Sequence, residues 1–183
     1  MDRTTTRHER HVGLEERTLL SVGSHGHALI SITTVRATEF IDITDRIVAL
    51  VASSGISLGI VNVQALHTTT AIVINEHEPL LLTDFETTLN NTAPINAVYS
   101  HDDPSRRSVN LIPNERTNGH SHCRALLLGA SACVNVVDSR LMLGRWQRLS
   151  TWRKALAVGG FAVGTFGLGF TLGGLIFGRW RKA

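Results

Sequence analysis

One stretch of the chain places chemically active side chains directly before an apolar run: Asn118-Gly119-His120-Ser121-His122, followed by Cys123-Arg124-Ala125-Leu126-Leu127-Leu128-Gly129. Asn118 suits the cap of a helix that runs to Leu128 and stops at Gly129. Neutral imidazoles bind divalent metals and also transfer protons. The stretch alone is equally compatible with histidines that are simply exposed at the surface. Whether it belongs to a functional site depends on which other side chains of the sequence could join it.

Size and charge limit the classes of function. The chain has 183 residues, enough for one domain with a sizeable core. Residues 1–144 carry 11 Arg against 15 Asp and Glu, whereas residues 145–183 carry 7 basic residues and no acidic one. No basic patch interleaved with aromatic residues occurs in the first part, so we expect no nucleic-acid partner. Residues 1–16 are polar and do not resemble a signal peptide, so we expect the domain to be cytoplasmic. We expect Cys123 and Cys133 to be buried as small apolar residues.

Strands and helices alternate along the chain. Runs of β-branched and apolar residues predict strands at 17–22, 28–34, 39–43, 56–66, 71–74, 132–137 and 141–149. Apolar spacing and caps predict helices at 44–54, 80–90 and 118–128. Residues 98–117 are expected to form a long polar loop, and a loop of that length without its own structure is usually functional or disordered. Hairpin-like neighbours outnumber βαβ units, so the sequence predicts an α+β fold.

Other polar side chains interrupt the apolar pattern. His67-Thr68-Thr69-Thr70 separates two predicted strands, or bends a single one, and forms a polar corner. Glu76 follows the second of these strands, and His101 begins the polar loop. These residues are the candidate partners of His120 and His122.

The order of these motifs resembles the YjbQ family, whose members are described as secondary thiamine-phosphate synthases. The resemblance covers roughly residues 15–149 and rests on five motifs: His67-Thr68-Thr69-Thr70-Ala71, Asn75-Glu76, Tyr99-x-His101, Asn118-x-His120-x-His122 and Leu143-Gly144-Arg145-Trp146-Gln147-Arg148-Leu149. Ser139 stands where the family favours Gly, and Arg145 where it favours Thr. After the Trp-Gln motif, members of the family continue into an acidic residue, a Gly-Pro-Arg-like segment and a last strand. From Ser150 onward, this sequence shows none of these features.

The resemblance implies an α+β fold in which a mixed sheet or β-sandwich carries flanking helices and three copies form a homotrimer with sites near subunit contacts. It implies a reaction that couples a pyrimidine diphosphate to a thiazole phosphate and releases pyrophosphate. It also implies a pocket that holds a divalent metal such as zinc.

Within that pocket, the resemblance assigns three kinds of role. His101, His120 and His122 would bind the metal, which would stabilise the diphosphate leaving group. His67 and Glu76 would act as acid, base or supporting groups. Contacts to a small phosphorylated substrate would come from Thr68, Thr69, Asn118 and Gln147. Alternatively, His67 completes the metal site and His101 transfers protons. Trp146 is expected in the core or a trimer contact, and His77 in solvent.

The domain of residues 17–149 is followed by a tail, residues 150–183. Residues 155–178 are uncharged, and as a helix these 24 residues would span about 36 Å, enough to cross a bilayer. Trp152 and Trp180 would lie at its ends. We therefore expect a transmembrane helix that anchors the domain to the cytoplasmic membrane, or else a tail that results from a shifted reading frame. The alternative function is a non-catalytic, membrane-tethered protein that binds a phosphorylated ligand and has lost the last strand.

Overall fold

The computed structural model describes residues 14–22, 25–32, 34, 38–111, 114–153 and 159–166. A short 3₁₀ turn at Ser100–Asp102 lies in the long loop. The helices are α1 (Thr44–Ser54), α2 (Pro79–Thr92) and α3 (Gly119–Leu128). The strands are β1 (Leu14–Val22), β2 (His25–Ile32), β3 (Glu39–Asp42), β4 (Leu58–Ala65), β5 (Thr70–Asn75), β6 (Ser131–Val137), β7 (Arg140–Leu141), β8 (Arg148–Arg153) and β9 (Gly159–Phe166).

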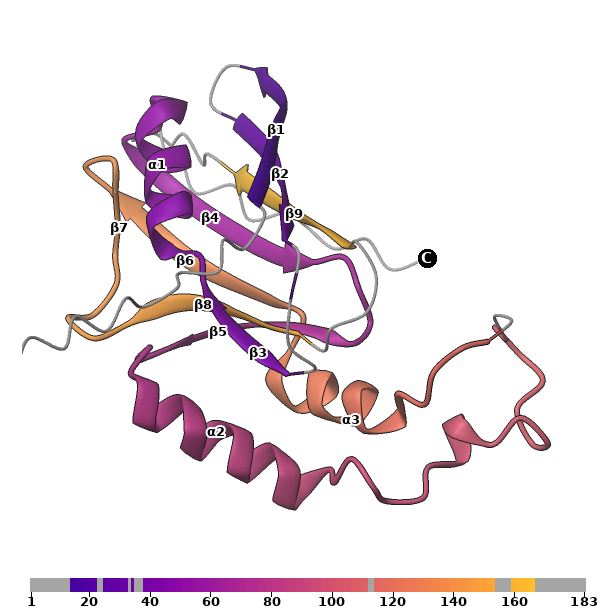
Figure 1. Cartoon of the computed structure of the whole chain (residues 1–183). Helices are drawn as coiled ribbons and strands as arrows, with labels where there is room; N and C mark the ends of the chain where they lie inside the picture. The colour runs from indigo at the N-terminus through magenta and orange to yellow at the C-terminus, as the bar shows by residue number, and fades with distance from the viewer. Residues whose placement is uncertain are drawn as a thin grey trace, which may run out of the picture.

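The strands in the described part of the chain form two antiparallel sheets. The larger has the order β1-β2-β9-β4-β6-β7, and the smaller has the order β3-β8-β5. Figure 1 shows α2 and α3 on one side of the three-stranded sheet and the six-stranded sheet with α1 on the other. The predicted α+β class is therefore confirmed.

The three-stranded sheet forms the middle layer because successive residues of a strand point to opposite faces. One face meets the six-stranded sheet and α1 in a core that includes Ile41, Ile72, Leu149, Ile47, Val51, Val61, Val63 and Val134. The opposite face meets α2 and α3 in a second cluster, made of Ala71, Trp152, Leu89 and Ala125. The polar corner at His67 links the two sheets, since β4 lies in one and β5 in the other.

The helix predicted at 44–54 is confirmed, and Gly55 ends it with φ of 72°. Thr44 lies inside the first turn and is not the cap. Instead, Asp42 accepts hydrogen bonds from the Thr44 backbone N–H at 2.9 Å and hydroxyl at 2.6 Å. Arg148 binds the same carboxylate at 2.7 Å, so β8 and the start of α1 are tied together.

The strand predicted at 141–149 is wrong, because a turn divides it between the two sheets. β7 ends at Leu141, and β8 begins only at Arg148. Between them, the Gln147 N–H donates to the Gly144 carbonyl at 2.9 Å, and the Gly144 N–H donates to the Gln147 side chain at 2.8 Å. These two bonds satisfy the backbone in a turn that apolar periodicity does not reveal.

The hairpin between β6 and β7 turns through two left-handed residues, Asp138 with φ of 50° and Ser139 with φ of 59°. This geometry is that of a two-residue turn that favours Asn, Asp and Gly. Ser at the second position is strained where Gly would not be, at a cost of about 1 kcal/mol.

The expectation of a missing last strand and of a membrane-spanning tail is wrong. β8 continues through Arg153, and β9 lies between β2 and β4 in the six-stranded sheet. Larger residues at 161, 163 and 165 alternate with Gly or Ala at 160, 162 and 164, which is a strand period. Among the residues that the structure covers, no helix is long and apolar enough to cross a membrane. The remaining parts of the predicted helix, 155–158 and 167–178, lie outside the described residues, as do residues 1–13 of the lead-in.

Both cysteines are exposed, which contradicts the expectation that they are buried. Cys133 alternates with the buried Val134 on β6, so its side chain points away from the core. Its thiol lies 3.3 Å from the Asn62 side-chain oxygen on the neighbouring β4.

Candidate functional site

The first turn of α3 is capped by a residue from the preceding loop. Asp102 accepts hydrogen bonds from the backbone N–H groups of Asn118 at 2.8 Å and Gly119 at 2.9 Å. A carboxylate at this position satisfies free N–H groups and interacts favourably with the helix dipole. Asn118 occupies the cap position, but its side chain makes no capping bond. Asp102 therefore fixes the polar loop to the start of α3.

Gly119 allows this close approach. A Cβ atom at Gly119 would lie 2.5 Å from the Tyr99 Cβ and 2.7 Å from its Cγ, distances that real Cβ atoms do not show. The segment from Tyr99 to Asp102 consequently lies directly against the helix. This contact brings His101 to the side of α3 that carries His122.

His101 and His122 form a pair of imidazoles. Their ring centroids are 4.5 Å apart, and the planes meet at 63° in an edge contact. Both residues are half-buried. The Nε2 atom of His101 is buried and has no hydrogen-bond partner among the described residues.

His67 is held in one orientation at the corner between the sheets. Its Nδ1 accepts a hydrogen bond from the Thr69 backbone N–H at 3.2 Å and lies 2.9 Å from the Thr69 hydroxyl. Since Nδ1 accepts, the neutral ring carries its proton on Nε2. His67 is exposed at the surface, but partial desolvation of its ring, and then the positive charge of Arg153, lower the pKa of His67 below its usual 6.5.

The electrostatic surroundings of His122 connect it to His67. Burial first, and then the positive charges of His101, His67 and Arg107, lower the pKa of His122 below 6.5, while Glu115 opposes this shift. We call His67, His101 and His122 the histidine site. His67 and His122 favour the neutral state because burial and nearby positive charges both disfavour the protonated ring.

A cavity of about 200 Å³ opens beside the histidine site in the polar loop. Its lining includes His101, Arg107, Glu115 and Arg116. Arg107 supports the loop: it forms an ion pair with Glu115 at 2.8 Å and donates to the Asn110 carbonyl at 2.6 Å. Arg107 is therefore part of the structure of the loop.

His120 lies apart from the other histidines of the sequence motif. It is only 3% exposed, and its ring centroid is 6.2 Å from that of Tyr99. Residues at i and i+2 of a helix are rotated by about 200° from one another, so His120 and His122 face different surroundings. In the ranges that the structure describes, no group of three or more His, Cys, Asp or Glu side chains could hold a metal. Within the described part of one chain, His101, His120 and His122 therefore do not come together as the predicted metal centre.

The structure places the remaining candidate residues in different parts of the molecule. Thr69 is buried and supports His67, whereas Thr68 is exposed. Glu76 is exposed beyond the opposite end of β5 from His67, and a six-residue strand alone spans about 17 Å. Gln147 bonds within its own turn. Within one chain, Glu76 and His67 therefore do not share a pocket.

The aromatic residue of the last motif is also outside the core. Trp146 is 61% exposed, and the Arg145 guanidinium carbon lies 4.7 Å from its ring centroid. This arrangement is a cation–π contact at the surface. It gives a local role to Arg145, the residue that departs from the family pattern.

Several polar contacts were not predicted from the sequence. Arg124 is buried and donates to the Ala93 carbonyl at 3.0 and 2.8 Å, which caps the end of α2. His77 lies 2.8 Å from the Ser150 hydroxyl through its Nδ1, so it is not simply solvated. The first contact joins residues 31 positions apart and has no local signal. The second joins residues 73 positions apart and has no local signal either.

Comparisons with known proteins agree on one family. A family model described as UPF0047 protein YjbQ-like matches residues 28–153. A UPF0047 protein of Methanothermobacter thermautotrophicus is 42% identical over 120 residues, 66% of this chain and 76% of that protein. One of Archaeoglobus fulgidus is 37% identical over 120 residues, 66% of this chain and 84% of that protein. The crystal structure of a YbjQ-like protein of unknown function from Sulfolobus solfataricus has a TM-score of 0.65 and 28% identity, and covers 85% of this chain and 98% of that chain.

These comparisons overturn the expected functions but bear out the family. The matching proteins are described as UPF0047 or YbjQ-like proteins, not as thiamine-phosphate synthases, so the expected thiamine synthesis is wrong. The alternative of a membrane-tethered protein without its last strand fails because β9 is present in the sheet. Since the family model covers most of the chain, the chain belongs to the UPF0047 YjbQ-like family.

Proposed function

We propose that the histidine site binds a small phosphorylated molecule and transfers protons to and from it. The observation that carries the proposal is the contact between the His101 and His122 rings, with His67 close enough to influence the charge of His122. Adjacent imidazoles are suited to acid–base catalysis because one ring can accept a proton while another donates one.

The lowered pKa values of His67 and His122 favour neutral rings at neutral pH. A neutral ring is the form that accepts a proton. When an anion binds, its charge favours the protonated imidazole and raises the pKa. Ligand binding and proton uptake are thus coupled at this site.

The charges around the site favour an anion. Arg107 and Arg116 line the adjacent cavity, and Arg153 acts on His67 from the sheet. Glu115 is the ion-pair partner of Arg107. Asp102 also lines the cavity, so Arg107 and Arg116 are balanced by two acidic residues there. Arg153 then leaves one surplus positive charge, which supports a phosphoryl group as the part of the ligand that lies against the histidines.

Self-association into a homotrimer is a second part of the proposal. Its support is the exposure of large apolar side chains: Leu126 is 84% exposed and Leu127 60% exposed, next to one another on α3. Adjacent apolar side chains on a surface often mark a protein contact. Light scattering should give three times the 20.0 kDa chain mass, and Leu126→Asp with Leu127→Asp should reduce it to a single chain. An unchanged mass in the double variant would exclude this face from the contact.

The ligand proposal can be tested with pyrophosphate as the probe. We would follow the histidine ring signals of the full chain by NMR and measure proton uptake by calorimetry in buffers of different ionisation enthalpy. Pyrophosphate should shift the signals of His67, His101 and His122 and cause net proton uptake near pH 7. His122→Ala should weaken binding at least about tenfold, because it removes a protonatable contact to a charged ligand.

His77→Ala is the matched control. His77 is also half-buried, but it follows the far end of β5 and contacts Ser150. Its removal should change the affinity by less than about twofold. Equal losses in the two variants, or pyrophosphate shifts confined to other histidines, would refute the proposed site.

A further inference from the structure

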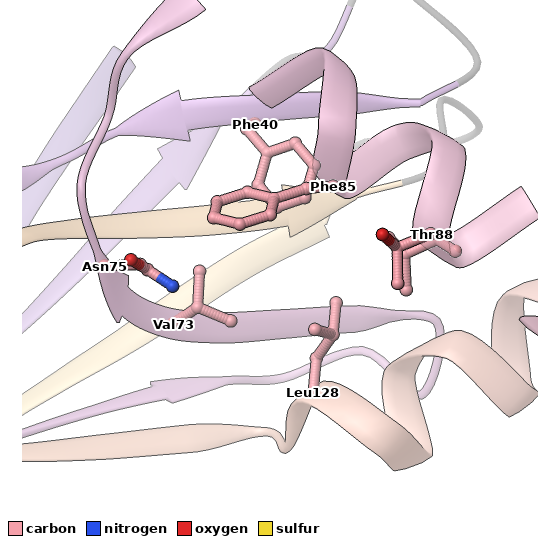
Figure 2. A pocket seen from close by; sticks show the side chains of 7 residues that line it. Phe40, Val73, Asn75, Phe85, Thr88 and Leu128 are labelled. Carbon is pink, nitrogen blue, oxygen red and sulfur yellow. The ribbon is translucent and has the colours of Figure 1, made fainter. Parts of the chain in front are cut away.

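A separate apolar pocket lies between α2 and the helix-facing side of the three-stranded sheet. Its volume is about 130 Å³. Figure 2 shows side chains from β3, β5, α2 and the last residue of α3 around it: Phe40, Val73, Phe85 and Leu128. Leu89 of α2 completes its apolar lining.

Two phenylalanines define one wall of the pocket. The Phe40 and Phe85 ring centroids are 5.8 Å apart, and the planes are tilted by 53°. Aromatic rings at this separation stabilise one another and keep their relative orientation. An enclosed cavity of about 150 Å³ lined by Leu, Ile and Phe binds benzene, and this pocket, although open on one side, is close to it in volume and lining. The pocket therefore has the size and chemistry to hold one aromatic ring.

The mouth of the pocket carries a polar group. Asn75 is exposed, and its side-chain oxygen accepts the Glu76 backbone N–H at 2.9 Å. With the oxygen engaged, the amide nitrogen is the group left to donate, and Figure 2 shows it on the side of Asn75 toward Val73 and the pocket. A ligand that places an acceptor at the mouth gains this hydrogen bond.

We propose that the pocket binds a small aromatic molecule, about the size of one six-membered ring, whose single hydroxyl or carbonyl group accepts from Asn75. The ring fills the space between Phe40, Phe85 and Leu128. The polar substituent remains at the open end, where water also reaches it. This binding site is independent of the histidine site.

Phenol and toluene are suitable probes for the full-length chain. In methyl NMR spectra of Leu- and Val-labelled protein, phenol should shift the Val73, Leu89 and Leu128 signals in a saturable manner. For a ligand of so few atoms we expect a dissociation constant on the order of 1 mM. The methyl signals of Leu126 and Leu127, on the exposed side of α3, should not change.

Variants distinguish filling of the pocket from loss of the polar contact. Leu128→Phe should occupy the space and weaken phenol binding at least about tenfold, whereas Leu80→Phe, at an exposed position in the first turn of α2, should change it less than about twofold. Asn75→Leu should weaken phenol by about fivefold but leave toluene binding unchanged, since only phenol loses a hydrogen bond.

Three results would overturn the proposal. In the first, phenol shifts the signals of exposed methyl groups in the wild type but not those of Val73, Leu89 and Leu128. This result does not depend on whether any variant folds. Another is equal phenol affinity in folded Leu128→Phe and the wild type. The third is a change in oligomer mass caused by phenol, which would mean that a second copy of the chain occupies the pocket.

Discussion

The two ends of α3 are held by different kinds of contact. At the first turn, Asp102 bonds two backbone N–H groups, and Tyr99 leaves no space for a side chain on Gly119. At the last residue, Leu128 borders a cavity of about 130 Å³. Hydrogen bonds and close steric contact fix a position within narrow limits, whereas apolar contact tolerates a void. The polar end can therefore position His122 for chemistry, and the apolar end can adapt to a guest.

The sharpest test of this contrast is Gly119→Ala. The added methyl group must displace the Tyr99 segment, so we expect a loss of about 3 kcal/mol in the free energy of unfolding. It should also broaden or shift the His101 and His122 ring signals. Chemical denaturation measures the first effect and NMR the second.

Gly144→Ala is the control for this substitution. Its Cβ would meet only the Gln147 side-chain oxygen at 3.3 Å, the far end of a flexible side chain. A loss below about 1 kcal/mol is expected. If both variants were equally stable, the close contact at Gly119 would not be what fixes the first turn.

Removal of the cap should have the next largest effect. Asp102→Ala leaves the N–H groups of Asn118 and Gly119 without their acceptor and should cost about 1.5 kcal/mol in unfolding free energy. Asp103→Ala is the matched control, because Asp103 bonds only within its own loop to Ser105. Its effect should be clearly smaller. The reverse order would show that the loop, and not the helix start, depends on these carboxylates.

At the apolar end, Leu128→Ala should cost about 1 kcal/mol, less than a fully buried leucine, because the side chain is half-buried beside an existing cavity. Leu80→Ala, 76% exposed at the start of α2, should change stability by less than about 0.5 kcal/mol. Thermal unfolding of the two variants makes the comparison. A loss at Leu128 as large as that at Gly119 would remove the distinction between the two ends.

The smallest effect should be a pH dependence of stability. The pKa values of His67 and His122 are lower in the folded protein than their usual 6.5. As pH falls below 6.5, the unfolded chain takes up these protons first, so stability declines until the folded sites are protonated as well. His67→Gln with His122→Gln should flatten this decline in the melting temperature between pH 7 and 5. Leu80→Gln, at an exposed position of α2, should keep the wild-type slope. An equally steep slope in the double variant would contradict the assignment.

Local signals were sufficient to predict much of the fold. The helix at 44–54 and its end at Gly55 follow from residues adjacent in sequence, as does the end of α3 at Gly129. The cap of α3 could not be predicted in this way, because Asp102 lies 16 and 17 residues before its two donors. β9 was missed because an uncharged, glycine-rich segment satisfies the composition of a membrane helix and the period of a strand at once.

The histidine site was predicted only in part. The motifs identified His67, His101 and His122, which the structure brings together. The addition of His120 was an error of geometry, since a helix over residues 118–128 already places i and i+2 on different sides. Glu76 was grouped with His67 by closeness in sequence, but an extended strand separates residues that a helix or turn would bring together.

The position of β9 has a consequence for the order of folding during synthesis. Within the described strands, β9 alone joins the β1–β2 hairpin to β4, and it pairs Ile32 with Gly159 and His25 with Phe166. On a ribosome, the hairpin emerges on the order of ten seconds before the strand that completes the sheet. During that interval β2 has no partner strand on the side where β9 will pair. The larger sheet is therefore complete only when the end of β9 has been made.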